Sequence, residues 1–147
     1  MNIQEVHRYL ENYQINPSVQ RSAIMQYLLD HFTHPTVDQI YADLLPNMPT
    51  LSKATVYNTL KLFVDKKAVK AIFIDERNVR YDAQTTLHAH FKCKRCNVIF
   101  EVPLEESDVP TFRGGPDLRL DETQIYFLGV CGKCIEMESK TDAGSVK

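Results

Sequence analysis

The chain has 147 residues, a hydrophobic fraction of 44% and a formal net charge of −2 at pH 7, which is the composition of a folded globular protein with one ordinary domain or two small ones. No apolar run reaches the roughly 20 residues that a membrane helix needs. The N-terminal residues lack the apolar stretch of a signal peptide. We therefore expect a cytoplasmic protein.

Charge is distributed unevenly along the chain. Residues 53–80 contain seven basic and three acidic residues, a net charge of +4, whereas residues 101–122 contain two basic and seven acidic residues, a net charge of −5. The first of these segments suits a polyanionic partner such as DNA, and the second does not.

Three short helices are predicted in the first 45 residues. Apolar residues recur at helical spacing within residues 3–13, 18–31 and 36–44. Ser18 and Thr36 follow proline-containing breaks or lie beside them, and both are good residues to cap the second and third helices. The side chains of the second helix that we expect to face a core are Ile24, Tyr27, Leu28 and Phe32.

A fourth helix is predicted to begin after Ser52, because Val56, Leu60 and Phe63 repeat at helical spacing. Two β-rich runs, at residues 69–74 and 79–81, follow it and are predicted to be joined by a hairpin turn at residues 75–78. This order, in which short helices are followed by a basic helix and a hairpin, is that of a winged helix, a DNA-binding helix-turn-helix with a β wing.

The character of the chain changes after Asp82. Short strands are predicted within residues 91–102 and at residues 125–130. Prolines and glycines between residues 103 and 117 argue against a long helix there. The last nine residues are polar and are expected to be frayed.

From this order we predict an α+β protein. Residues 1–83 would form the winged-helix DNA-binding domain and residues 84–138 a small α/β domain. Residues 139–147 would form a flexible tail.

All four cysteines lie in two Cys-x2-Cys pairs, Cys93 with Cys96 and Cys131 with Cys134. Two residues between cysteines let both thiolates reach one ion, so the set is typical of a tetrahedral zinc site with a structural role. Because cytosolic thiols stay reduced, we favour zinc over two disulfides or inert thiols. A redox dithiol is the remaining alternative.

Two histidines precede the first cysteine pair. His88 and His90 alternate along a predicted strand, so both rings point to one face. Asp82 and Glu101 bracket them, and His34 lies in a His-Pro-Thr break between helices. Three imidazoles and two carboxylates would suit Fe²⁺, Mn²⁺ or Zn²⁺. The alternative is that the two strand histidines are simply solvated.

The helix after Ser52 is the candidate DNA-contacting element. Its side chains include types that bond phosphates and base edges. They are Lys53, Thr55, Tyr57, Asn58 and Lys61. The alternative is an ordinary solvated amphipathic helix, and the following hairpin and the local positive charge favour DNA.

Several stretches together resemble the ferric uptake regulator (Fur) family over residues 16–134. The matching segments are Pro17-Ser-Val-Gln20-Arg21, His34-Pro-Thr-Val-Asp-Gln-Ile-Tyr41, Ser52-Lys-Ala-Thr-Val-Tyr57-Asn58, Arg80-Tyr81-Asp82, His88-Ala-His90-Phe-Lys-Cys93-x2-Cys96 and Val130-Cys131-x2-Cys134. In combination they are far more specific than any one of them.

The resemblance implies a metal-dependent homodimeric repressor with an N-terminal winged helix and a C-terminal dimerisation domain held by a four-cysteine zinc site. It implies that the regulatory ligands are His34, Asp82, His88, His90 and Glu101. His34 would come from the DNA-binding domain, so that metal binding would favour one DNA-competent geometry of the dimer.

For DNA, the resemblance supports a contact by Tyr57 and adds Arg21, which lies in a matching stretch, to the candidates. The dimer would read a pseudo-palindromic, A·T-rich operator.

The sequence also departs from the family pattern. Asp82 resembles the peroxide-sensing branch, in which bound Fe²⁺ reacts with hydrogen peroxide and a ligand histidine is oxidised, whereas Glu101 resembles the iron-sensing branch. Residues 121–124 carry no histidine where many members have one, so a further metal site is not expected. The proline- and glycine-rich residues 110–116 stand where the family has a dimerisation helix.

We therefore predict a transcriptional repressor, not an enzyme, that senses peroxide or iron through an Fe²⁺ or Mn²⁺ site. Two other classes stay open. A metal-dependent hydrolase would use His88 and His90 but needs an open metal position. A zinc-ribbon module would bind protein, and salt-dependent DNA affinity would separate it from a repressor.

Overall fold

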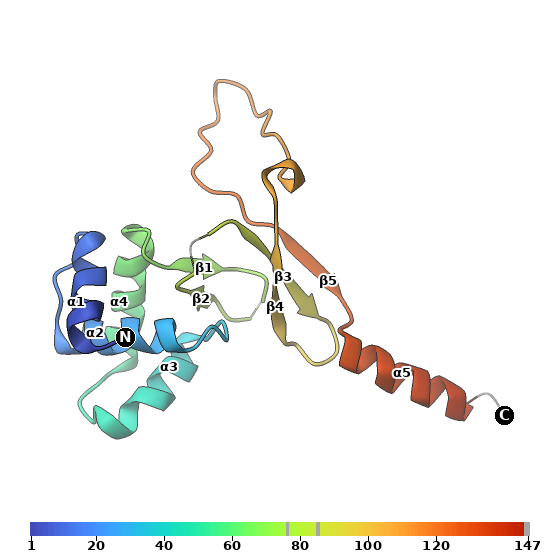
Figure 1. The fold of residues 1–147 in the computed structure, drawn as a ribbon, viewed down its shortest axis with the longest axis horizontal. Coiled ribbons are helices and arrows are strands. Elements are labelled where there is room, and N and C mark those ends of the chain that lie inside the picture. The colour runs from blue at the N-terminus through green and yellow to red at the C-terminus, as the bar shows by residue number, and fades with distance from the viewer. Residues whose placement is uncertain (76, 85, 146–147) are drawn as a thin grey trace. The chain divides into compact units, whose positions relative to one another are not determined.

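The computed structural model describes residues 1–75, 77–84 and 86–145, with side chains up to Lys140 (Figure 1). The helices are α1 (Ile3–Asn12), α2 (Val19–Asp30), α3 (Val37–Leu44), η1 (Leu45–Asn47), α4 (Lys53–Asp65), η2 (Glu106–Asp108) and α5 (Gly132–Ser145). The strands are β1 (Lys70–Ile72), β2 (Arg80–Asp82), β3 (His88–Cys93), β4 (Ile99–Pro103) and β5 (Tyr126–Gly129).

The chain divides into an N-terminal unit, Met1–Thr86, and a C-terminal unit, Leu87–Lys147. This division falls three residues after the boundary expected from the sequence. The helices, the β1–β2 hairpin and the small three-stranded sheet make an α+β architecture, as predicted.

Side-chain caps begin the helices of the N-terminal unit where the sequence predicts them. The Ser18 hydroxyl accepts a hydrogen bond from the Arg21 N–H, and the Ser52 hydroxyl accepts one from the Thr55 N–H. Thr36 forms a reciprocal capping box with Gln39 at the start of α3. Each cap satisfies an N–H group that has no partner within its helix, which fixes where that helix starts.

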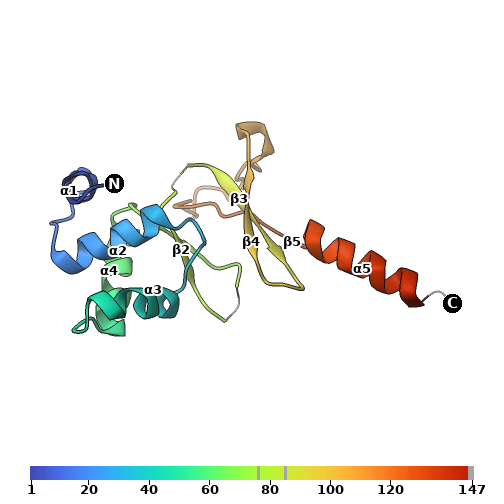
Figure 2. The same ribbon diagram turned by 60° about the horizontal axis from the view of Figure 1, so that its bottom comes forward.

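The core of the N-terminal unit gathers around α4. Val56, Leu60 and Phe63 are fully buried, and they form one cluster with apolar side chains of α1, α2 and α3. Figure 2 shows α2, α3 and α4 packed together in this unit. The expectation for Phe32 is wrong: it follows the end of α2 and is 51% exposed, because the chain has already left the helix.

The wing is an antiparallel hairpin of β1 and β2, with Lys70 opposite Asp82. The turn predicted at residues 75–78 includes Glu76, which lies outside the described residues. Helices α1 to α4 followed by this hairpin give the predicted winged-helix order.

The sheet of the C-terminal unit has the strand order β4-β3-β5, with β3 antiparallel to β4 and parallel to β5. Residues 104–125, all of which are described, contain the 3₁₀ turn η2 and no α-helix. This agrees with the expectation drawn from the prolines and glycines there. This segment joins β4 to β5 across the sheet, and much of it is exposed.

Helix α5 continues to Ser145 and so includes most of the segment expected to be a flexible tail. Among the described residues, no helix combines the length and apolar character that crossing a membrane requires.

The central position of α4 generates a stability prediction. Leu60→Ala should lower the free energy of unfolding of the N-terminal unit by about 2–5 kcal/mol, because it removes a fully buried side chain and leaves a cavity. Urea unfolding followed by circular dichroism would measure the loss. The neighbouring exposed variant Lys61→Ala is the control, and equal effects of both variants would contradict this core assignment.

Candidate functional site

The two cysteine pairs meet in space within the C-terminal unit. Cys93 ends β3, Cys96 lies in the turn before β4, Cys131 precedes α5 and Cys134 lies in its first turn. The four sulfur atoms lie within 4.8 Å of one another, and the sulfurs of Cys96 and Cys131 are 3.8 Å apart. Zinc–sulfur bonds of roughly 2.3 Å in a tetrahedron place sulfurs about 3.8 Å apart, so the cluster has the size of a zinc site.

Backbone geometry shapes this cluster. The N–H groups of Cys96 and Cys131 point at the Cys93 sulfur, at 3.5 Å and 3.4 Å. Asn97 closes the first turn with a left-handed φ of 63°, which asparagine tolerates better than most residues, and its N–H donates to the Cys93 carbonyl oxygen. The turn therefore holds both thiols of the pair toward one point.

The thiols differ in acidity. Hydrogen bonds from the backbone N–H groups of Cys96 and Cys131 lower the pKa of Cys93 to about 6. The hydrogen bond with the Cys131 thiol and burial raise the pKa of Cys134 to about 12. Without a cation the cluster therefore favours one thiolate and opposes a second, and a divalent ion is what would let all four ionise together.

His34 and Asp82 are brought together within the N-terminal unit. The Nε2 atom of His34 lies 3.6 Å from Oδ2 of Asp82, and both residues are buried. His34 has a left-handed φ of 57°, a conformation uncommon for a residue with a side chain.

Arg80 explains how the chain holds that conformation. Its Nη1 atom donates to the His34 carbonyl oxygen at 3.1 Å, and its Nη2 atom pairs with Asp75 at 3.3 Å. The Tyr81 N–H donates to the Pro35 carbonyl oxygen, so the segment that carries His34 is fastened to β2 at the residue before Asp82. Sequence reasoning gave Arg80 no structural role, because its partner, the His34 carbonyl oxygen, lies 46 residues away in the chain.

The remaining candidate ligands share one face of the C-terminal sheet. His90 lies opposite Glu101 on β4 and opposite Tyr126 on β5. His88 precedes His90 by two residues and therefore points to the same face. Phe91 lies opposite Phe100 and Phe127, so the other face is aromatic.

The donor atoms on the ligand face converge. The Nε2 atoms of His88 and His90 are 3.1 Å apart, and His88 Nε2 lies 3.8 Å from Oε1 of Glu101. Two nitrogens bound at right angles to one ion at roughly 2.1 Å would be about 3.0 Å apart. The spacing thus fits two cis ligands of one ion, with the carboxylate beside them.

The candidate DNA residues divide between α2 and α4. Arg21, Thr55 and Asn58 line one cleft of about 580 Å³ between the two helices. Tyr57 is 53% exposed, and Lys61 is also exposed. These side chains are accessible from outside the N-terminal unit.

Lys53 is also exposed, but it is not without partners. Its ammonium group lies 3.2 Å from Asp38 and 5.7 Å from the centre of the Tyr41 ring. Both members of the ion pair are largely solvated, so the pair holds Lys53 weakly.

The chain resembles proteins of known role. A model of the ferric uptake regulator family matches residues 12–111. The peroxide-responsive repressor PerR of Staphylococcus epidermidis is 35% identical over 119 residues, which cover 80% of this chain and 79% of the relative.

Two solved structures of related proteins have a similar fold. The structure of PerR from Streptococcus pyogenes, described as a basis for peroxide sensing and gene regulation, has 29% identity and a TM-score of 0.50 and covers 90% of this chain and 92% of its own. The ferric uptake regulator of Helicobacter pylori, described as having three functional metal binding sites, has 16% identity and a TM-score of 0.69 over 92% and 95% of the two chains. At that identity, the second likeness concerns the fold alone.

The sulfur geometry generates a prediction. The purified protein should retain one zinc ion per chain after dialysis against a mild chelator, and Cys134→Ser should lose it, because one neutral hydroxyl would replace a thiolate. Elemental analysis gives the zinc content. His88→Ala, a change outside the cysteine cluster, is the control and should keep its zinc. A zinc-free protein whose mass indicates two disulfides would refute the prediction.

Proposed function

The chain belongs to the ferric uptake regulator family, and from this membership we propose that it is a metal-dependent, DNA-binding transcriptional repressor that responds to hydrogen peroxide. The observation that carries the proposal is the converging pair of imidazoles, His88 and His90, with Glu101 beside them on one sheet face. The 35% identity to a peroxide-responsive repressor favours peroxide as the signal. As members of this family are regulators, a role in the cytoplasm on DNA is expected rather than an enzymatic one.

The four cysteines would hold a structural zinc ion. Four thiolates complete a tetrahedral shell and leave no open position for substrate, so the ion would stabilise the fold rather than catalyse a reaction. The C-terminal unit has few buried apolar side chains of its own, so such a staple would contribute much of its stability.

The regulatory ion would be Fe²⁺ or Mn²⁺, with Zn²⁺ as a competitor, held by His34, Asp82, His88, His90 and Glu101. Nitrogen and carboxylate donors together suit these ions. Since the first two ligands belong to the N-terminal unit and the other three to the C-terminal unit, ion binding would favour the arrangement of units in which all are engaged. Bound Fe²⁺ would supply the reactivity toward peroxide that Mn²⁺ lacks.

The N-terminal unit would bind the operator through α4. The proposed contacts are Arg21, Lys53, Thr55, Tyr57, Asn58 and Lys61. Three of these line one cleft and the other three are exposed, which supports the proposal. We expect a pseudo-palindromic, A·T-rich site, because a dimer reads two half-sites related by its own symmetry.

The C-terminal unit would form the homodimer. Exposed apolar side chains on and beside its sheet, including Phe100, Phe127 and Leu128, support this role. The family has a dimerisation helix in this region, but no α-helix lies between β4 and β5 in the described residues. We therefore propose that the sheet and residues 104–125 form the dimer interface instead.

A second candidate is a repressor that reports the supply of metal. Glu101 favours it, because the resemblance places a glutamate at this position in iron-sensing members. A longer carboxylate can fill a coordination position that peroxide needs.

One experiment separates the two candidates. The zinc-loaded dimer would be bound anaerobically to a fluorescent A·T-rich palindrome with Fe²⁺ or with Mn²⁺, and anisotropy would be read before and after a small pulse of hydrogen peroxide. A peroxide sensor should release DNA from the iron form only, and a ligand histidine should gain one oxygen atom by mass.

Retention of DNA by both metal forms after the pulse would favour the metal-supply candidate. If neither metal promotes DNA binding, the regulatory site is wrongly assigned, and a zinc-ribbon interaction module becomes the better interpretation.

His88→Ala should abolish metal-stimulated DNA binding while leaving the cysteine cluster loaded. Losing an outer-shell partner alone weakens metal binding about 10–100-fold, so loss of a ligand should cost at least about 100-fold in Mn²⁺ affinity. Isothermal titration with Mn²⁺ and anisotropy with operator would measure both effects. His7→Ala is the control, and operator affinity equal to that of the unchanged protein in excess Mn²⁺ would exclude His88 as a required ligand.

A further inference from the structure

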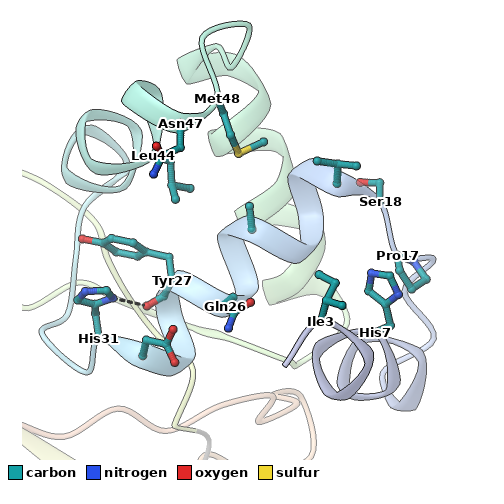
Figure 3. Close-up of a pocket in the computed structure, with 13 residues that line it drawn as sticks. Ile3, His7, Pro17, Ser18, Gln26, Tyr27, His31, Leu44, Asn47 and Met48 are labelled. Atoms are coloured by element: carbon teal, nitrogen blue, oxygen red, sulfur yellow. Dashed lines mark hydrogen bonds between the residues drawn. The ribbon is translucent and has the colours of Figure 1, made fainter. Parts of the chain in front are cut away.

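A groove of about 760 Å³ lies in the N-terminal unit, outside all the proposed metal and DNA contacts (Figure 3). Its lining comes from α1, α2, α3 and η1, with helix α2 running along it. A volume of this size is in the range that binds small organic molecules, roughly 300–1,000 Å³.

Most of the groove is apolar. Ile3 on one side and Val19 on α2 are exposed by 52% and 81%, although they are aliphatic. Leu44 and Met48 line the opposite side in Figure 3. Aliphatic side chains that face each other across a solvent-filled groove gain free energy when an apolar molecule displaces the water.

One end of the groove presents hydrogen-bond acceptors. The Nδ1 atom of His31 donates to the Tyr27 carbonyl oxygen at 2.9 Å, which leaves Nε2 of the neutral ring as an acceptor. The two rings stack, with centroids 4.3 Å apart. Asp30 adds a carboxylate, for which no ion pair occurs among the residues that the structure describes.

Two of the donors along the groove are already engaged. The Tyr27 hydroxyl donates to Asp43, and the side-chain amide of Gln26 donates to the Met1 carbonyl oxygen. The lining contains no lysine or arginine and a single carboxylate. An anionic ligand would therefore find no lysine or arginine in the lining, whereas an ammonium group would find both a carboxylate and an imidazole acceptor.

We propose that this groove binds a small apolar molecule that carries an ammonium group, with its apolar part over Ala23 and beside Leu44 and its ammonium group at Asp30 and His31. A helix from a partner protein fits the groove less well. The groove has acceptors at one end only, and its lining has no basic residue that could pair with acidic residues beside such a helix.

The site adjoins the chain segment that carries His34. His31 ends α2, and Tyr27 is bonded to Asp43 of α3, so the groove contacts the helices on both sides of the His34 loop. If His34 ligates the regulatory ion, which rests on the function proposed above, then occupancy of the groove should change Mn²⁺ affinity, and Mn²⁺ should change ligand affinity by the same factor.

Tryptamine tests the site directly in the full-length, zinc-loaded protein. The chain has no tryptophan, so indole fluorescence reports the probe alone. Tryptamine anisotropy should rise on titration with protein, with 3-methylindole binding more weakly and indole-3-acetate not detectably. Asp30→Asn should weaken tryptamine binding about tenfold, as expected for loss of a charge-assisted hydrogen bond. Ala23→Lys, which places a cation in the middle of the groove, should abolish it.

Glu11→Gln on α1 is the matched control, because it removes the same charge outside the groove. The proposal would be overturned if Glu11→Gln weakened tryptamine binding as much as Asp30→Asn does, if indole-3-acetate bound as tightly as tryptamine, or if tryptamine did not bind. A change of oligomeric state in ligand-free Ala23→Lys by sedimentation would also overturn it, since a second copy would then cover the groove. If tryptamine binds without changing the affinity for Mn²⁺, only the coupling to His34 is refuted, and the ligand site itself is confirmed.

Discussion

The C-terminal unit depends on the convergence of four sulfur atoms. Its buried apolar residues are few, and two of them, Cys93 and Cys134, are themselves members of the cluster. The cluster ties the β3–β4 turn to the start of α5, two segments that are far apart in sequence. A unit of about 60 residues with so small a core is marginal without a staple. The sheet that carries His88, His90 and Glu101 therefore depends on this cluster, and the proposed zinc and regulatory sites are physically linked.

Arg80 plays the corresponding part in the N-terminal unit. A left-handed φ at His34 costs about 1–3 kcal/mol unless the surroundings hold it. The guanidinium bond to the His34 carbonyl oxygen and the backbone bond from Tyr81 to Pro35 supply that restraint. At His34 the left-handed conformation falls on the residue whose ring lies beside Asp82, so the hairpin is both the wing and the support of a candidate ligand.

Much of the fold could be predicted from local signals. The caps at Ser18, Thr36 and Ser52 follow from side chains that bond N–H groups three residues later, and helical periodicity located the core of α4. The four-cysteine cluster followed from spacing. The role of Arg80 could not be predicted, because its partner is a backbone carbonyl 46 residues away. The groove was missed because α2 has apolar residues on both faces, and periodicity cannot tell which of them face solvent.

Strand geometry gives the C-terminal sheet two separate tasks. Because successive side chains alternate, β3 directs His88 and His90 to one face and Ala89, Phe91 and Cys93 to the other. Gly129 allows the Phe91 ring to lie close to β5, since a Cβ there would be 2.8 Å from its Cζ atom. Aromatic packing and the proposed metal ligation are thus encoded at alternating positions of a single strand. A one-residue slip of β3 against β4 would exchange the two faces, so the pairings of His90 with Glu101 and of Phe91 with Phe100 determine each other.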